Sequence, residues 1–178
     1  LLDEYPQTQY FQTKVEVEID GRVEQVWIEP KAENVFTFDS PAKPQLVNFD
    51  YEGTLIKEIK FEKSTDELIY QFKNDKDLLG RVWAMNQLVA RLNRSGREAA
   101  DKTKILAALN QAVTAEPVWQ IRRDVIQAIT IQPGNPNQAN APAANFDPAT
   151  VTALTTAAKD ANSAVRAAAI NGLGLLRD

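Results

Sequence analysis

Residues 64–92, STDELIYQFKNDKDLLGRVWAMNQLVARL, decide the fold expected of this chain, because the spacing of the apolar residues changes within them. Before Asp75 the apolar residues alternate with polar ones, as in a strand, at Leu68, Tyr70 and Phe72. After it they recur at helical spacing, at Leu79, Val82, Trp83, Met85, Leu88, Val89 and Leu92. This change predicts an α+β chain in two units: a β domain at residues 1–74 and a helical domain at 75–178, whose first helix has Asn74 or Asp75 as N-cap.

The first half carries short strand patterns separated by turn residues. Residues 11–19 alternate apolar with polar, Asp20-Gly21 is a strong hairpin signal, and the apolar pattern resumes at Val23. Further strands are expected at 35–38, 45–49, 55–61 and 68–72, although the last could be a short helix opened by residues 64–67. Short strands with turn signals about every 8 to 12 residues predict a small antiparallel β-sandwich. Trp27 is expected inside its core.

The second half contains an internal repeat. Segments that begin at Asp75, Ala115 and Asp160 are aligned through three arginines, which lie 41 and 44 residues apart. The register also aligns smaller apolar residues three positions later and larger ones four positions after those. The repeat positions are Arg81, Arg122 and Arg166, then Ala84, Val125 and Ala169, then Leu88, Ile129 and Leu173. Periods of about 40–47 residues built from helix pairs are those of HEAT and armadillo arrays, in which stacked neighbours bury each other's apolar faces.

The pattern Asp-x-x-x-x-Val-Arg-x-x-Ala-x-x-x-Leu-Gly, nearly complete from Asp160 to Gly174, resembles a HEAT repeat. That resemblance implies a HEAT-like helical superhelix in which each arginine and the acidic residue before it tie neighbouring repeats together. Asp75 and Asp160 fit the acidic position and Ala115 departs from it, so the tie is expected to fail in the middle repeat. The three arginines are therefore interpreted as structural residues.

Three other segments complete the helical half. Residues 97–114 and 149–159 have the amphipathic or alanine-rich character of partner helices. Residues 132–148 contain four prolines and are expected to form a long loop. Because Leu1 is not an initiator methionine and Asp178 ends the third repeat helix without a capping helix, we expect the chain to be a fragment of a longer protein.

Composition narrows the chemistry. The net charge is −4, and no basic face is expected that would bind nucleic acid. No apolar run approaches the roughly 20 residues of a membrane span, so the chain is expected to be soluble. The sequence has no cysteine and no histidine, which removes thiol chemistry, the commonest general base and the commonest zinc ligand. The compartment stays open: bacterial cytoplasm and periplasm both tolerate a domain without cysteine.

The junction between the halves resembles the region after the catalytic domain of zinc aminopeptidases of the aminopeptidase N type. The resemblance is carried by Pro44-Gln-Leu-Val-Asn-Phe-Asp50, by Lys63-Ser64-x-Asp66-Glu67-Leu68-x-x-Gln71, and by Asn74-Asp75-x-Asp77-x-x-x-Arg81-x-x-Ala84. It implies a non-catalytic scaffold and lid that packs on an upstream catalytic domain and shapes the access of a peptide or protein substrate. Zinc would belong to that domain's His-Glu-x-x-His motif; no cofactor or metal ligand is expected in this chain, which should be no enzyme by itself.

Two other functions compete with the scaffold. A protein-interaction module without catalytic activity is the main alternative. A free-standing enzyme would have to use carboxylates such as Asp66, Glu67, Asp75 and Asp77, which are more simply explained as turn, cap and solvated residues. The one aromatic and basic cluster on a helix, Trp119, Arg122 and Arg123, could grip a substrate carboxylate, but packing of Trp119 and solvation of Arg123 are favoured.

Overall fold

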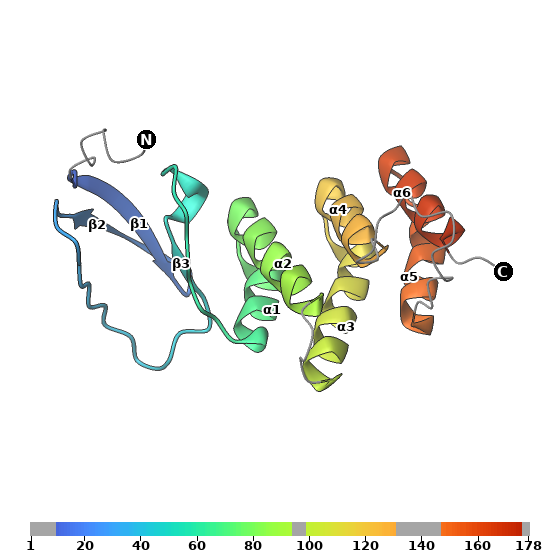
Figure 1. The fold of residues 1–178 in the computed structure, drawn as a ribbon, viewed down its shortest axis with the longest axis horizontal. Helices are drawn as coiled ribbons and strands as arrows, with labels where there is room; N and C mark the ends of the chain where they lie inside the picture. Colours follow the sequence, from blue (N-terminus) through green and yellow to red (C-terminus); the bar gives the residue numbers. More distant parts are fainter. Residues whose placement is uncertain (1–9, 94–98, 131–146, 176–178) are drawn as a thin grey trace, which may run out of the picture. The chain divides into compact units, whose positions relative to one another are not determined.

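The computed structural model describes residues 10–93, 99–130 and 147–175, in which three strands precede six α-helices (Figure 1). The chain divides into two compact units, Leu1–Arg81 and Val82–Asp178. The first unit holds β1 (Thr13–Ile19), β2 (Arg22–Ile28), β3 (Val47–Phe49), the 3-10 turn η1 (Tyr51–Gly53) and α1 (Thr65–Asn74). Helix α2 (Leu78–Leu92) begins in the first unit and continues in the second.

The predicted hairpin is confirmed. Strands β1 and β2 pair antiparallel from Thr13 opposite Ile28 to Ile19 opposite Arg22, and β3 pairs antiparallel with the other edge of β1. Asp20 and Gly21 form the turn with φ of 48° and 85°, the left-handed conformation of a type I′ turn, which suits aspartate and glycine. Asp20 Oδ1 then accepts the N–H groups of Gln45 and Leu46 at 3.0 and 2.9 Å, which fixes the entry to β3.

The predicted β-sandwich is wrong, because the described residues form a single three-stranded sheet. Residues 35–38 and 55–61 form no strand. The second of these segments follows Asp50, a left-handed residue with φ of 56°, whose buried carboxylate accepts bonds from Thr54 N at 3.0 Å, Leu55 N at 3.0 Å and Lys57 Nζ. The start of this segment is therefore held by hydrogen bonds to the Asp50 carboxylate and not by backbone hydrogen bonds to a neighbouring strand.

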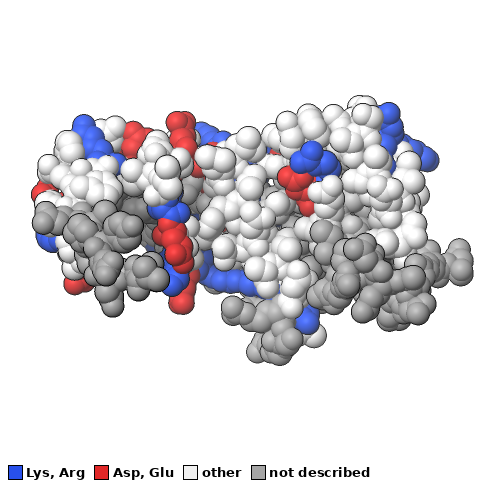
Figure 2. Space-filling view, turned by 45° about the horizontal axis from the view of Figure 1, so that its top comes forward, with Lys and Arg blue, Asp and Glu red and all other residues white. Residues whose placement is uncertain are grey.

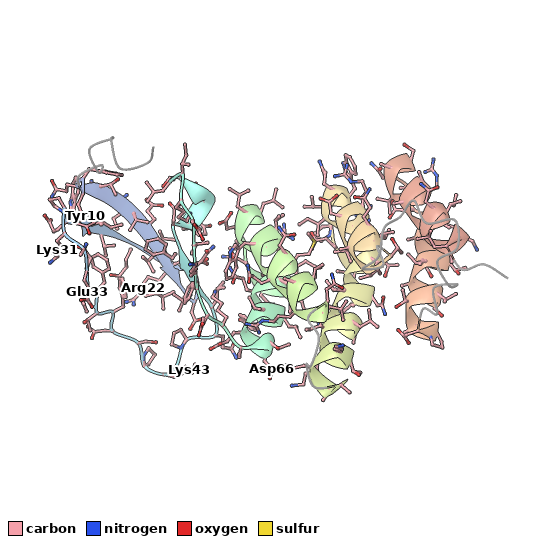
Figure 3. All side chains as sticks on the ribbon, viewed as in Figure 1. Tyr10, Arg22, Lys31, Glu33, Lys43 and Asp66 are labelled. Atoms are coloured by element: carbon pink, nitrogen blue, oxygen red, sulfur yellow. The ribbon has the colours of Figure 1, made fainter. Side chains whose placement is uncertain are left out.

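The expected last strand, 68–72, lies within helix α1. Ser64 Oγ accepts the N–H of Glu67 at 3.2 Å, and a Glu67 carboxylate oxygen accepts the N–H of Ser64 at 2.7 Å, a complete capping box. Lys43, on the segment before β3, pairs with Glu67 at 2.8 Å; Figure 3 labels Lys43 and, at the start of the helix, Asp66. The apolar residues Leu68 and Phe72 are one helical turn apart and both 1% exposed, so the apparent alternation was a helical face.

The second unit contains two helix pairs. Helix α3 (Ala99–Ala115) packs on α4 (Trp119–Thr130), and α5 (Pro148–Ala157) packs on α6 (Ser163–Gly174). Helix α3 also contacts α5 while α4 contacts α6, so the second pair stacks on the first (Figure 1). The predicted partner helices are thus confirmed as α3 and α5. Most of the expected loop, 132–148, lies outside the described residues. The predicted HEAT-like superhelix is wrong, because the six helices found in the described ranges are too few to make one.

Two side chains have different environments from those expected. Trp27 was predicted in a core, but it is 51% exposed on the sheet, and Lys14 Nζ lies 5.0 Å from its ring centroid. The predicted N-cap of the second helix is also wrong, because Asp75 ends α1 as its C-cap. Asp77 opens α2 instead: its Oδ1 accepts the N–H of Leu79 at 2.9 Å.

Candidate functional site

The most unusual feature of the first unit is a set of buried polar side chains, here called the junction cluster: Asn48 of β3, Gln71 of α1, and Asp75 and Asp77 between α1 and α2. They are between 1% and 8% exposed. Asn48 Nδ2 donates to Asp75 Oδ2 at 3.1 Å and to Asp77 Oδ2 at 3.2 Å, and Gln71 Nε2 donates to Asp75 Oδ2 at 2.9 Å. The cluster therefore ties the third strand to the end of one helix and the start of the next.

The two aspartates also bind backbone groups. Asp75 Oδ1 accepts the N–H of Asp77 at 2.8 Å, and Asp77 Oδ2 accepts that of Glu52 at 3.1 Å. Every carboxylate oxygen of the pair thus has a donor, as buried charges require. Burial nonetheless raises the pKa of Asp75, against the lowering effect of the bond from Gln71.

Lys63 brings a cation to the edge of the junction cluster. Its Nζ donates to Gln71 Oε1 at 2.6 Å and to the carbonyl oxygen of Val47. Burial lowers the pKa of Lys63 to about 8, although the carboxylates of Asp75, Glu67 and Glu18 favour its charged form. The ammonium group orients the Gln71 amide so that its N–H faces Asp75.

Gly80, in the first turn of α2, is required by this packing. A Cβ atom built on it would lie 2.1 Å from Asp75 Oδ2 and 2.6 Å from Asn48 Nδ2. Neither of those groups can retreat without breaking the bond between them. The glycine therefore lets the helix backbone approach the cluster more closely than any other residue would allow.

The second unit holds a charged pair of a different kind. Arg122 of α4 binds Asp160, in the turn between α5 and α6, through Nε to Oδ2 at 2.8 Å and Nη2 to Oδ1 at 2.9 Å. Their side chains are 14% and 11% exposed, and the guanidinium group is the first cause of the lowered pKa of Asp160. This bidentate bond joins one helix pair to the next.

The same local geometry recurs at each repeat. The backbone N–H of Arg81, Arg122 and Arg166 donates to the carbonyl four residues earlier, in the first turn of a helix. Nη1 of Arg122 also donates to the carbonyl oxygens of Glu116 and Pro117 at 2.8 and 3.1 Å, as that of Arg166 does to those of Asp160 and Ala161, both at 2.9 Å. Arg122 and Arg166 thereby each close the turn that precedes their own helix.

The prediction that the middle repeat lacks its acidic residue is wrong. The residue six positions before Arg122 is Glu116, not Ala115, and it is 9% exposed. Asp75, Glu116 and Asp160 each accept the N–H two residues later, at 2.8, 3.1 and 2.8 Å. Counting back from the arginines would have found Glu116 in the sequence.

The remaining repeat positions lie on inner helix faces. Ala84, Val125 and Ala169 are fully buried, and so is Leu88, whereas Ile129 and Leu173 are half-buried. The glycine of the repeat pattern, Gly174, has no atom within 4 Å of an added Cβ, whereas Gly172 would meet Thr130 Cγ2 of α4 at 2.7 Å. Gly172 therefore sets the close approach of α6 to α4.

The sequence offered a candidate cluster for binding a substrate carboxylate at Trp119, Arg122 and Arg123, but both arginines pair with acidic residues of the chain. Arg122 is held by Asp160, as described above. The guanidinium carbon of Arg123 lies 5.4 Å from the centroid of the Trp119 ring, and its Nη2 pairs with Asp124 Oδ1 at 2.6 Å. The structure therefore places the two arginines in separate ion pairs and does not bring them together toward one ligand.

Sequence reasoning missed the members of the junction cluster. Asp75 and Asp77 were expected to be solvated, but they are 3% and 7% exposed. Asn48 and Gln71 lie inside the family-like motifs, but their role is visible only from their hydrogen-bond partners. For Asn48 these partners are more than 20 residues away in the chain. Asp66 is exposed and Glu67 caps α1, as a turn and cap interpretation requires.

The described residues show no metal centre, and the face drawn in Figure 2 shows no large surface patch of one charge. Among the residues that the structure describes, no group of three or more aspartates and glutamates is placed to hold a metal ion. Figure 2 shows basic and acidic side chains lying next to one another on the face in view. No helix in the described ranges is long and apolar enough to cross a membrane. A scan against protein-family models gives no match, and searches of curated proteins and solved structures give none either.

Proposed function

We propose that this chain is a non-catalytic scaffold of a zinc-dependent aminopeptidase-like protein, which packs on its catalytic domain and shapes the access of substrate. The observation that carries this proposal is the bonding of the buried charged residues, exemplified by the bidentate pair of Arg122 and Asp160. These residues fasten one element to another. The family-like motifs support the proposal further, because Asn48, Asp75 and Asp77 fall within them and serve the same fastening role.

The physical argument rests on what a catalytic carboxylate needs. A general base or metal ligand keeps a lone pair directed at its target. In the junction cluster the oxygens of Asp75 and Asp77 already accept bonds from backbone N–H groups and side-chain amides. Using either residue for chemistry would break the contacts that hold β3 against the start of α2, so a supporting role is favoured.

The first experiment is an assay of the purified 178-residue chain on aminoacyl chromogenic substrates, with and without added zinc. We expect no hydrolysis above background. Measurable hydrolysis that the aminopeptidase inhibitor bestatin suppresses would contradict the proposal.

The second experiment uses a protein in which a His-Glu-x-x-His catalytic domain precedes this segment. Arg122→Ala should lower the melting temperature of such a protein and leave kcat per folded molecule unchanged, because the arginine holds two helix pairs together and touches no substrate. Arg123→Ala is the matched control, since it removes a charge next to Arg122 but leaves the bond to Asp160 intact. A fall of kcat with no fall of melting temperature would refute the scaffold.

The alternative is a protein-interaction module, which one observation favours. Trp27 and Val23 are 51% and 42% exposed and lie four residue pairs apart in β2, on the same face of the sheet. Exposed aromatic residues of this kind are enriched where proteins bind one another. Trp27→Ala should then weaken capture of a partner protein by the chain while the stability of the chain changes little. Unaltered capture would contradict the interaction module and favour the scaffold.

A further inference from the structure

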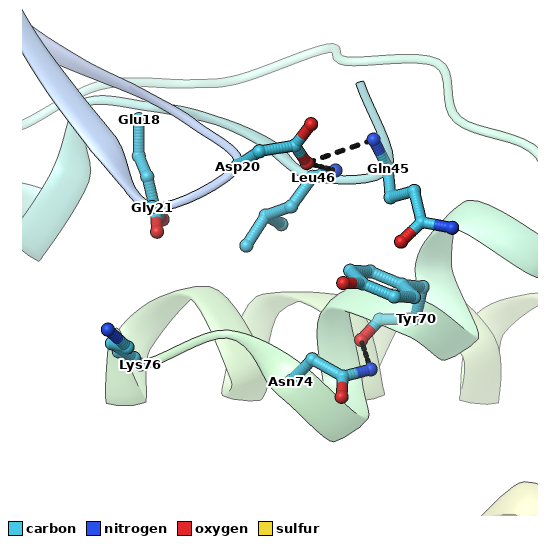
Figure 4. A pocket seen from close by; sticks show the side chains of 8 residues that line it. All are labelled: Glu18, Asp20, Gly21, Gln45, Leu46, Tyr70, Asn74 and Lys76. Atoms are coloured by element: carbon cyan, nitrogen blue, oxygen red, sulfur yellow. Dashed lines mark hydrogen bonds between the residues drawn. The ribbon is translucent and has the colours of Figure 1, made fainter. Parts of the chain in front are cut away.

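The first unit contains a pocket of about 310 Å³ between the hairpin turn, the segment that enters β3, and helix α1. Figure 4 shows its walls: the carboxyl group of Glu18 and the side chain of Leu46 point into it from the sheet side, facing Tyr70, Asn74 and Lys76. A pocket of this volume is at the lower end of those that hold small molecules. The pocket plays no part in the bonds of the junction cluster or in the Arg122–Asp160 pair described above.

Glu18 is the unusual residue of this pocket. It is 2% exposed, and its Oε2 atom has no hydrogen-bond partner among the residues that the structure describes. An unmatched buried acceptor is costly, since it has given up water without a replacement. The nearby Asp75 and Asp77 add negative charge, so a positively charged hydrogen-bond donor in the pocket would stabilise the ionised carboxylate.

The wall opposite Glu18 carries a positive charge. Lys76 is exposed, and its positive charge acts on Glu18. Leu46 and the ring of Tyr70 supply apolar surface beside the two charges (Figure 4). Asp20 already accepts the N–H groups of Gln45 and Leu46. The pocket thus presents a carboxyl group with an unmatched oxygen on one wall and an exposed ammonium group on the facing wall.

We propose that this pocket binds a small zwitterion of the α-amino acid type, whose ammonium group donates to Glu18 and whose carboxylate faces Lys76. Binding would supply the donor that the buried carboxylate lacks. The proposal goes beyond a scaffold role, because it gives the first unit a ligand of its own. It needs no residue of the junction cluster to change its bonds.

Acid should abolish this binding. Burial, followed by the charges of Asp75 and Asp77, raises the pKa of Glu18, while Lys76 opposes that rise. A hydrogen bond to Asp75, which only the protonated carboxyl group can donate, raises the pKa further. As the pH falls, Glu18 takes up a proton at a higher pH than an ordinary carboxylate and then no longer attracts an ammonium group. The titratable groups whose charges act on Glu18 or are influenced by it are Tyr51, Lys63, Asp75, Lys76 and Asp77.

The test is a titration of the full chain, followed by the backbone amide NMR signals of pocket residues such as Gly21 and Lys76, with three probes. L-leucine has both charges, N-acetyl-L-leucine lacks the ammonium group, and L-leucinamide lacks the carboxylate. We expect saturable shifts with L-leucine, binding at least tenfold weaker with N-acetyl-L-leucine, and binding severalfold weaker with L-leucinamide. Absence of saturable shifts with L-leucine, or equal affinity for L-leucine and N-acetyl-L-leucine, would overturn the proposal.

Variants locate the binding. Glu18→Gln, which keeps the size of the side chain, should weaken L-leucine at least tenfold, whereas Glu58→Gln, at an 86% exposed side chain of the same unit, should leave it unchanged. Lys76→Gln should weaken L-leucine severalfold without affecting L-leucinamide. Because Lys76 is exposed, this variant decides the matter even if Glu18→Gln fails to fold. Unchanged affinity in Lys76→Gln, or in a folded Glu18→Gln, would refute the site.

Discussion

At the scale of single residues, Glu18 shows how an uncompensated charge lowers stability. The pKa of Glu18 is raised in the folded chain, so the folded state binds its proton more tightly than the unfolded state does. Its contribution to stability is therefore fully present below the ordinary pKa of 4.5 and is lost as the pH rises through the higher value in the folded state. The residue opposes folding at neutral pH.

Glu18→Gln should accordingly stabilise the chain at neutral pH, by about 1 kcal/mol, because a buried charge is replaced by an amide that can donate to Asp75. The difference from the wild type should shrink to nothing below pH 4.5, where the glutamate is protonated in both states. Urea unfolding at a series of pH values measures it. A variant less stable than the wild type at neutral pH would show that the carboxylate has a partner after all.

Gly80 gives a second prediction at this scale. Gly80→Ala should lower the free energy of unfolding by about 1–3 kcal/mol, the usual range for overpacking, because the new methyl group would collide with Asp75 Oδ2 and Asn48 Nδ2. Gly174→Ala is the control: its Cβ meets no atom within 4 Å, so stability should stay within about 0.5 kcal/mol. Denaturant unfolding compares the two, and equal effects would count against the close approach at Gly80.

At the scale of elements, the bond between Arg122 and Asp160 carries the connection between helix pairs. Arg122→Ala should destabilise the chain by about 2 kcal/mol, less than the loss of a fully buried ion pair, because both side chains keep some exposure. Arg123→Ala should cost less than about 1 kcal/mol, since its pair with Asp124 is more than one-third exposed on each side.

A double-mutant cycle isolates the Arg122–Asp160 bond from the other bonds of each residue. Arg122→Ala and Asp160→Ala should be non-additive by 1 kcal/mol or so, since either change alone already breaks the bidentate contact. Because the pKa of Asp160 is lowered, this coupling should be present above pH 3.8 and be lost as the pH falls below it. Additive effects at neutral pH would mean that the bond contributes nothing to stability.

Elements also show how far the sequence could predict the structure. The hairpin could be predicted because Asp20-Gly21 is a local signal, and α3 and α5 could be predicted from their composition and spacing. Helix α1 was ambiguous, because Leu68, Tyr70 and Phe72 fit a strand as well as a helix, and the capping box of Ser64 and Glu67 decides between them. Residues 55–61 failed as a strand because Asp50, several positions earlier, binds the chain that leads to them.

The candidate site was harder to predict than the fold. The burial of Asp75 depends on Asn48, 27 residues away, and no local pattern reveals such a partner. Gly80 looks like an unremarkable helix glycine until the cluster beneath it is known. The arginine register, by contrast, was visible in the sequence, and a count of six residues back from Arg122 identifies Glu116 without any coordinates.

At the scale of the whole molecule, the central claim is that buried charged residues fasten the elements within each unit. The junction cluster does so in residues 1–81, and Arg122 with Asp160 does so in residues 82–178. Because none of the hydrogen bonds described for these two sets joins one unit to the other, damage to one set should stay within its own unit. The two sets therefore provide independent tests in one chain.

Hydrogen exchange measured by mass spectrometry on the full chain tests this claim most directly. Gly80→Ala should speed amide exchange in β1, β3 and α1, and Arg122→Ala should speed it in α4, α5 and α6, each leaving the other unit close to wild type. If neither variant changed exchange within its own unit, the buried charges would not be fastening the fold, and the scaffold account would be contradicted.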